Sequence, residues 1–401
     1  MARPKPSPSV VVIGGGILGA IVGHQAAKLG LETIIYRLGD LFRPEADSLR
    51  NHGWLQSGLL YAHDEPEVAA AMRWSGRLML REYGLEPPAA RGVFRVSNEA
   101  DAEALLEGAK RLRLSGLVER MSDAEIRRDL GPFYVPNRPC FRVPDAPFDQ
   151  ALLLRRVRRA GVRQRAVFRD VVQPISLRPI GGNKGRFIVV TPDGEHEPDV
   201  TVLATGCGTP KILEPLGIAP PLKVVRSPLL NMRAGDLLKD VPLFVDRSSQ
   251  LATVRHPSVS WGGNVLVVGN RSRPQVPSLG PMPRQITRLE EQKLLELLPP
   301  QIRPTAGAYR TTAGFKTESL DNQRESTIKP WVYTPPEWPG LIVAVPGKAT
   351  MSLATADRVL STVVELIGKR SSKSGLPSLT SSWVDDVRMH FDYPDLDERT
   401  P

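Results

Sequence analysis

The pattern of apolar and polar residues over 9–37 predicts a strand, a glycine turn, a helix and a second strand, in that order. A β-branched run at 10–13 ends in three glycines, and an alanine-rich stretch then continues to Lys28, just before Gly30. A second β-branched run follows at 33–36. Short β-branched runs predict buried strands, and an apolar stretch that ends at glycine predicts a helix. The segment therefore predicts a βαβ unit of about 30 residues.

The rest of the chain has helix-and-strand segments near both ends and a strand-rich segment between them. Proline and glycine separate the short apolar runs of residues 216–310, which is typical of an antiparallel sheet. The further predicted helices are 150–160, 284–298 and 352–367, and the further predicted strands include 166–172, 185–191, one within 199–208, 241–246, 264–269 and 340–345. This order predicts the α/β class, with a Rossmann-like dinucleotide-binding domain and an inserted, mostly antiparallel β-sheet domain.

The glycines of the first turn complete the motif G-x-G-x-x-G. Gly14 permits the tight turn, Gly16 lets a pyrophosphate approach the backbone, and Gly19 lets helix and strand pack closely. Because the motif lies between a predicted strand and a predicted helix, it indicates a dinucleotide site that includes Ile17 and Leu18.

Length and composition fit an ordinary globular protein. The 401 residues are enough for two domains, and 41% of them are hydrophobic and 24% charged. We expect a cytoplasmic protein without a cleaved leader or a transmembrane segment. The two cysteines, Cys140 and Cys207, exclude a disulfide framework and a C-x-x-C site, so no metal is expected.

The formal net charge of +10 raises nucleic acid and other anions as partners. Seven arginines lie between Arg155 and Arg169, and four of them share one arc of the predicted helix 150–160 while Leu153 lies on the other. The surplus is therefore mostly a solvated helix face, which could dock a partner or the acidic residues within 385–398. No nucleic-acid-binding motif accompanies it, so we expect no nucleic-acid partner.

The order of five segments resembles the FAD-dependent oxidoreductases of the D-amino acid oxidase and glycine oxidase superfamily. The segments are the glycine motif at 14–19, a loop at 46–61, Phe148-Asp149-Gln150, the stretch 199–208 and the last predicted strand and helix start at 341–358. The loop is similar to that of the L-2-hydroxyglutarate oxidase branch, where it lies against the flavin ring. The resemblance extends over nearly all of residues 9–367 and implies FAD as the cofactor.

The resemblance also implies a division of the chain and a set of site residues. The FAD-binding domain takes residues 9–80, 145–215 and 325–368, the substrate domain takes 81–144 and 216–324, and 369–401 form a C-terminal tail. The cofactor-binding residues are Gly14, Gly16, Ile17, Leu18, Gly19, Arg37, Ser48, Asn51, His52, Gly53, Val172, Thr205, Gly206, Gly347, Lys348, Ala349, Thr350 and Met351. The candidate catalytic residues are His52, Gln56, Tyr61, Arg310 and Lys316.

Residues 347–351 form the start of the last predicted helix. Backbone N–H groups at a helix start carry about half a positive charge, and the N1–C2=O2 edge of a flavin becomes negative on reduction. Lys348 would add a full charge there and stabilise reduced flavin, and the alternative is a surface lysine without that role.

Arg37 stands where dinucleotide folds usually place Asp or Glu, whose carboxylate accepts hydrogen bonds from the ribose hydroxyls. Arginine has only donors and more often meets a 2′-phosphate. Three interpretations stay open: FAD binds with Asp40 or backbone carbonyls in place of the carboxylate, NADP is the ligand, or cofactor affinity is degraded. The other four segments favour FAD.

The sequence differs from the family pattern at two further places, where the family has groups that react with or bind the substrate. The hydroxyglutarate oxidase pattern has a serine at the place of His52 and a histidine at the place of Gln56. Glutamine takes no proton at neutral pH but histidine titrates near it, so His52 is either the base or a hydrogen-bonding partner of the flavin or its loop. Lys316 stands at the place of a carboxylate-binding arginine, or is a solvated lysine, and Arg310 is the alternative anchor.

The resemblance therefore implies an FAD-dependent oxidase or dehydrogenase that oxidises an amino acid, an amine or a 2-hydroxy acid by hydride transfer to flavin. The small-molecule substrate is expected to carry a carboxylate, which Lys316 and Arg310 would hold. The replaced positions Arg37, Gln56 and Lys316 leave open a non-catalytic flavoprotein or an electron-passing subunit of a larger complex. A protein partner or a homo-oligomer is compatible with either.

Overall fold

The central layer is a six-stranded sheet whose strands come from both ends of the chain. The structure is a computed structural model, and it describes residues 8–38, 47–49, 52–86, 88, 91–171, 175–180, 186–256, 265–270, 285–320 and 326–373. The strands are β1 (Ser9–Ile13), β2 (Glu32–Leu38), β8 (Val167–Val171), β12 (Val200–Leu203), β19 (Trp331–Tyr333) and β20 (Leu341–Val345). Their order is β19-β20-β12-β1-β2-β8, and only β19 runs antiparallel to its neighbour. Residues 10–13 of β1 are buried, as expected for a β-branched strand covered on both faces.

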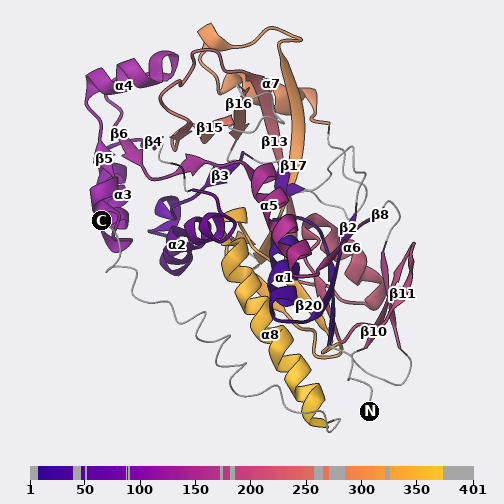
Figure 1. Ribbon diagram of the computed structural model, residues 1–401. Helices are drawn as coiled ribbons and strands as arrows, with labels where there is room; N and C mark the ends of the chain where they lie inside the picture. The colour runs from indigo at the N-terminus through magenta and orange to yellow at the C-terminus, as the bar shows by residue number, and fades with distance from the viewer. Residues whose placement is uncertain are drawn as a thin grey trace.

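Helices and a small sheet cover the two faces of this layer. On one face α1 lies against both α5 and α8, and their apolar residues share one core with Val10 and Ile35 (Figure 1). On the other face Val11 and Tyr36 pack against Phe187 and its neighbours in a three-stranded sheet. The elements are α1 (Ile17–Lys28), α5 (Gln150–Arg163) and α8 (Ser352–Lys373) on the first face, and β9 (Ser176–Pro179), β10 (Phe187–Thr191), β11 (Gly194–His196) and α6 (Thr209–Leu213) on the second.

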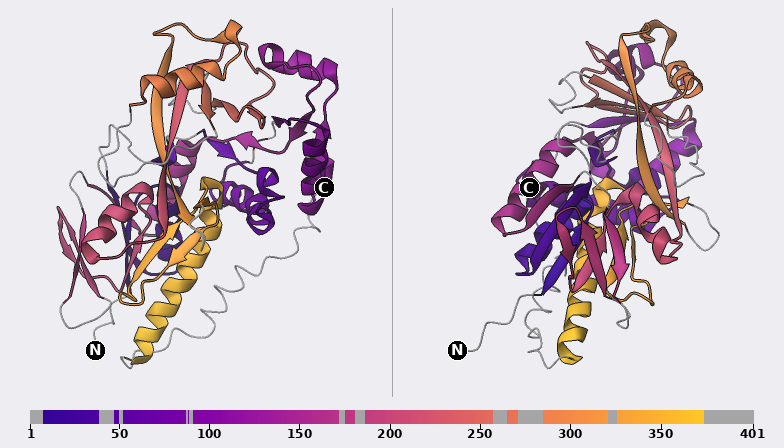
Figure 2. Two further views of the ribbon diagram at one scale, coloured as in Figure 1. Left: turned by 180° about the vertical axis from the view of Figure 1, so that it is seen from behind. Right: turned by 90° about the vertical axis from the view of Figure 1, so that its right-hand side faces the viewer.

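The second layer is a nine-stranded sheet in the order β18-β17-β13-β16-β15-β14-β4-β6-β5. Its neighbouring strands are antiparallel except β14 and β4, which run parallel. Figure 2 shows the two long strands, β13 and β17, running from this sheet toward the first layer. The strands are β4 (Gly92–Arg95), β5 (Glu119–Arg120), β6 (Cys140–Val143), β13 (Leu222–Arg233), β14 (Leu243–Asp246), β15 (Leu251–His256), β16 (Val265–Asn270), β17 (Tyr309–Leu320) and β18 (Ser326–Thr327).

The remaining elements join the two layers or cover the second one. β3 pairs with β7 between the layers, and α2 contacts α8. The remaining bounds are β3 (Trp54–Leu55), β7 (Ala146–Pro147), α2 (Pro66–Glu82), α3 (Glu99–Arg111), α4 (Asp123–Leu130) and α7 (Arg288–Glu296). None of the helices within the described ranges combines the length and apolar character needed to cross a membrane.

The predicted α/β class, with an inserted and mostly antiparallel sheet, is confirmed, and the predicted elements occur with shifted ends. On α5, Arg155, Arg156 and Arg159 are exposed while Leu153 and Val157 are buried, so the solvated arginine face is confirmed for three of its four arginines. The fourth, Arg158, is only 28% exposed and pairs with Asp170.

The last helix is longer than the sequence predicted. It continues to Lys373, beyond its predicted end at residue 367 and into the segment that the sequence assigned to the C-terminal tail. A Cβ on Gly368 would meet no atom within 4 Å, and glycine costs a helix interior only about 1 kcal/mol, so Gly368 does not end α8. Residues 374–401 lie outside the described part.

Gly19→Ala tests the close packing of α1 on the glycine turn. The added Cβ would lie 1.7 Å from the carbonyl oxygen of Gly14, so we expect the free energy of unfolding to fall by about 2–4 kcal/mol in urea titrations. Gly368→Ala is the matched control, because it adds the same methyl group to open space in a helix and should gain about 0.5–1 kcal/mol. Equal effects of the two changes would contradict the packing argument.

Candidate cofactor and substrate site

A cleft of about 380 Å³ opens at the carboxyl ends of β1, β12 and β20. In open parallel sheets this edge is where ligands bind. The cleft brings together predicted residues from distant segments: Gly14, Gly16, Ile17, Leu18, Arg37, Ser48, Thr205, Gly206, Lys316, Gly347, Lys348 and Ala349. Cys207, Phe315 and Thr317 line it too and were not predicted. The predicted residues Asn51 and Val172 lie outside the described residues.

The glycine turn has the shape that a pyrophosphate requires. Gly14 has φ of 122°, and a Cβ there would lie 2.3 Å from the carbonyl oxygen of Ala204 at the end of β12. Gly19 lets α1 approach the turn, and the Ile17 N–H at the helix start donates to Ser48 Oγ at 3.3 Å. A turn without side chains at a helix N-terminus is an anion-binding cradle, so these residues fit the pyrophosphate of FAD.

Arg37 lines the cleft, but its guanidinium is already paired. Its Nε donates to Asp170 Oδ1 at 2.6 Å, and the two residues are register partners on β2 and β8. Asp40, the carboxylate that the sequence offered as a replacement, lies outside the described residues. Asp170 was not predicted, because only the strand order shows that it stands beside Arg37.

The start of the last helix meets the predicted flavin loop. Gly347 has φ of 65°, and a short 3₁₀ turn (Ala349–Met351) leads into α8. Lys348 is only 9% exposed, and its Nζ lies 5.7 Å from the ring centroid of Tyr61. The alternative of a surface lysine is therefore wrong. The N–H of Gln56 donates to Thr350 Oγ1 at 3.4 Å, which links the loop to the helix start.

His52 is a half-buried residue beside the cleft, and its ring is neutral at pH 7. Burial, followed by the charges of Lys316 and Lys348 and then by His256, lowers the pKa of His52 to about 3. The expectation that this ring titrates near neutrality is therefore wrong. Its Nε2 is buried without a hydrogen-bond partner among the residues that the structure describes, and a Cβ on Gly269 of β16 would lie 1.9 Å from it.

A buried carboxylate that the sequence did not reveal fixes the loop around Gln56. Asp145 is 1% exposed and accepts hydrogen bonds from Trp54 Nε1 at 2.9 Å, from the Ser57 N–H at 3.1 Å and from the Ser57 hydroxyl. Burial raises the pKa of Asp145 to about 6, although these hydrogen bonds oppose the rise. Gln56 Oε1 is buried and has no hydrogen-bond partner within the described ranges.

Lys316 and Arg310 cannot hold the same carboxylate. Both lie on β17, six residues apart, and a strand rises about 3.3 Å per residue, so roughly 20 Å separates them. Lys316 lines the cleft, whereas Arg310 is exposed. The prediction that the two act together is wrong, and Lys316 stays the candidate anchor.

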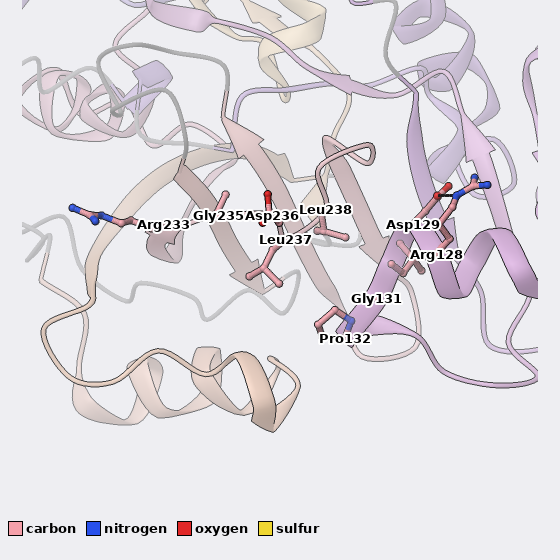
Figure 3. A pocket seen from close by; sticks show the side chains of 11 residues that line it. Arg128, Asp129, Gly131, Pro132, Arg233, Gly235, Asp236, Leu237 and Leu238 are labelled. Carbon is pink, nitrogen blue, oxygen red and sulfur yellow. Dashed lines mark hydrogen bonds and ion pairs between the residues drawn. The ribbon is translucent and has the colours of Figure 1, made fainter.

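A second hollow of about 440 Å³ lies between the end of α4 and the segment after β13 (Figure 3). It contains none of the predicted site residues. Its buried carboxylate, Asp129, already accepts from Arg128 Nε at 2.6 Å and from Arg142. We therefore place the functional site in the smaller cleft, where the glycine turn and the helix start converge.

The burial of His52 predicts a loss of stability in acid. The unfolded chain binds a proton near pH 6.5 that the folded ring does not take until about pH 3, so stability falls as the pH drops through this window. Relative to His52→Gln, the protein should lose about 2 kcal/mol between about pH 7 and about pH 5 in urea unfolding. His63→Gln, at a side chain that is 77% exposed, is the control, and a loss shared by all three proteins would contradict the argument.

Solved structures that are similar in fold to this chain include two oxidases. Glycine oxidase from Geobacillus kaustophilus aligns with a TM-score of 0.70 at 18% identity, over 89% of this chain and 94% of that chain. The FAD-bound L-alpha-glycerophosphate oxidase from Mycoplasma pneumoniae aligns with a TM-score of 0.68 at 15% identity, over 90% and 95% of the two chains. At this identity the likeness confirms the fold.

The sequence comparisons identify the family. Anaerobic glycerol-3-phosphate dehydrogenase subunit A1 of Haloferax volcanii is 29% identical over 146 residues, which cover 36% of this chain and 25% of that protein. This chain thus matches only a quarter of that relative's length. The family described as FAD dependent oxidoreductase (DAO) matches residues 9–359, most of the chain, so the protein belongs to the DAO family of FAD-dependent oxidoreductases.

Proposed function

We propose that the protein oxidises the C–N or C–O bond of a small anionic substrate, an amino acid, an amine that bears an acidic group or a 2-hydroxy acid, by hydride transfer to FAD. The observation that carries the proposal is the presence of two lysines in one cleft, beside a histidine whose Nε2 atom is shielded from solvent. Lys316 and Lys348 line the same cleft, and after burial their charges are the next largest causes that lower the pKa of His52. Positive potential beside a buried hydrogen-bond acceptor favours an anion with a transferable proton.

Bound FAD supplies a two-electron acceptor, and the chain supplies position and charge. Gly14, Gly16 and the start of α1 would hold the pyrophosphate. The helix start at Ala349 and the buried Lys348 would stabilise negative charge on the flavin pyrimidine edge.

The remaining residues would bind and orient the substrate. Lys316 would hold its anionic group, and Gln56 Oε1 would accept one of its hydrogen bonds. Neutral His52 presents an unprotonated nitrogen that can accept the substrate proton. An anion bound at the lysines would offset part of the charge effect that lowers the pKa of His52, so the substrate itself would make this base stronger.

A second candidate is an electron-passing subunit of a larger complex. It is favoured by the similarity to a relative whose name marks it as a dehydrogenase subunit. Oxidation of substrate with little peroxide formation in air, but fast electron transfer to an added dye, would point to this function.

Anaerobic mixing with candidate substrates tests the proposal. Amino acids, 2-hydroxy acids and glycerol 3-phosphate are added to the FAD-reconstituted protein, and at least one class should bleach the flavin band near about 450 nm. Bleaching by dithionite but by none of these substrates would contradict the proposal and leave a non-catalytic flavoprotein.

Lys316→Met tests the anion anchor with the substrate that this panel identifies. Loss of one charge-assisted hydrogen bond should raise the half-saturating substrate concentration by about 10- to 100-fold. Lys329→Met is the matched control, because Lys329 is exposed, and it should leave that concentration unchanged. An equal effect of both changes would contradict the role of Lys316 as the anchor of the substrate anion.

A further inference from the structure

Arg37, Asp170 and Arg158 form an ion-pair cluster at the edge of the cofactor cleft. Arg37 Nε donates to Asp170 Oδ1 at 2.6 Å, and Arg158 Nη2 donates to Asp170 Oδ2 at 3.4 Å. The side chains of Arg37 and Asp170 are only 13% and 15% exposed. Such a shielded pair is worth more than a pair on the open surface, and each oxygen of the carboxylate has a cationic donor.

Two features of the backbone hold Arg37 in this place. The parallel register of β2 and β8 sets it directly beside Asp170. Gly15 of the glycine turn leaves the space that the side chain crosses, because a Cβ on Gly15 would lie 2.5 Å from Arg37 Cβ. Arg37 therefore lies beside the turn that binds the pyrophosphate. It also lies at the end of the strand where a dinucleotide fold binds the adenosine ribose.

The charge of this cluster bears on which dinucleotide fits. An arginine without a counter-ion at this strand end suits a 2′-phosphate, whereas a carboxylate suits a free 2′-hydroxyl. Here the arginine and a carboxylate are both present and neutralise each other. Arg158 adds a further positive charge, but its guanidinium lies over the Phe168 ring, 5.2 Å from the centroid, and it does not line the cleft.

We propose that Asp170 cancels the charge of Arg37 at the adenosine end of the cleft, so that the site selects a dinucleotide without a 2′-phosphate although an arginine occupies the end of β2. Among the described residues only Nε of Arg37 is paired with Asp170, so its terminal nitrogens can donate to hydroxyl or adenine acceptors. Asp170 is thus a specificity-determining residue for the cofactor. The inference concerns the adenosine end alone and stands apart from the proposed substrate chemistry.

Competition binding to the flavin-free full chain tests the proposal. Adenosine 5′-monophosphate and adenosine 2′,5′-bisphosphate differ only in the 2′-phosphate, and each displaces FAD in a titration that is followed by flavin fluorescence. The unchanged protein should bind the monophosphate at least as tightly as the bisphosphate. Asp170→Asn should shift the ratio of affinities about tenfold toward the bisphosphate, and adding Arg37→Gln should reverse that shift.

Asp193→Asn is the matched control, because it breaks the exposed pair with Arg169 and should leave the ratio unchanged. A preference of the unchanged protein for the bisphosphate, or an unaltered ratio in folded Asp170→Asn, would overturn the proposal. If Asp170→Asn does not fold, Arg37→Gln alone decides. It should change the ratio by less than about threefold, whereas an arginine that reads a phosphate would lose about tenfold.

Discussion

The close approach of the first glycine turn to the end of β12 is the constraint on which the site depends. Gly14 lies against the carbonyl of Ala204, and Gly19 lies against the carbonyl of Gly14, so no side chain fits at either position. Because of these contacts β1, β12 and the start of α1 meet at one edge of the sheet. β20 runs parallel beside β12 and brings Gly347 to the same edge. The shape of the pyrophosphate-binding turn is therefore set by the backbone and does not depend on polar side chains.

The charged groups of the site follow from where the two layers touch. Lys316 comes from β17 of the nine-stranded sheet, and Lys348 precedes the last helix of the six-stranded layer. Both act on His52 in the loop between them. Asp145 holds that loop through Trp54 and Ser57. The electrostatic potential at the imidazole of His52 therefore depends on how the two layers meet, and a displacement of either layer would change it.

Local patterns predicted most of the fold, and each error has its own physical cause. The βαβ unit, the arginine face of α5 and the strand-rich insertion were predicted correctly, because they depend on residue period and on turn chemistry. The pairing of Arg310 with Lys316 failed because one extended strand keeps them apart. The end of α8 was misjudged because Gly368 lies in open space, where a helix tolerates glycine.

By itself the sequence determined the glycine cradle and the dinucleotide fold, because steric fit and hydrophobic period act over neighbouring residues. The further segments that line the cleft were implied by the family resemblance. Only the tertiary structure decided the partners and the charge states. Arg37 meets Asp170 across 133 residues, Ser57 meets Asp145 across 88, and burial beside two lysines keeps His52 neutral. Coulomb energies and the cost of desolvation depend on distances in space, which the order of residues does not contain.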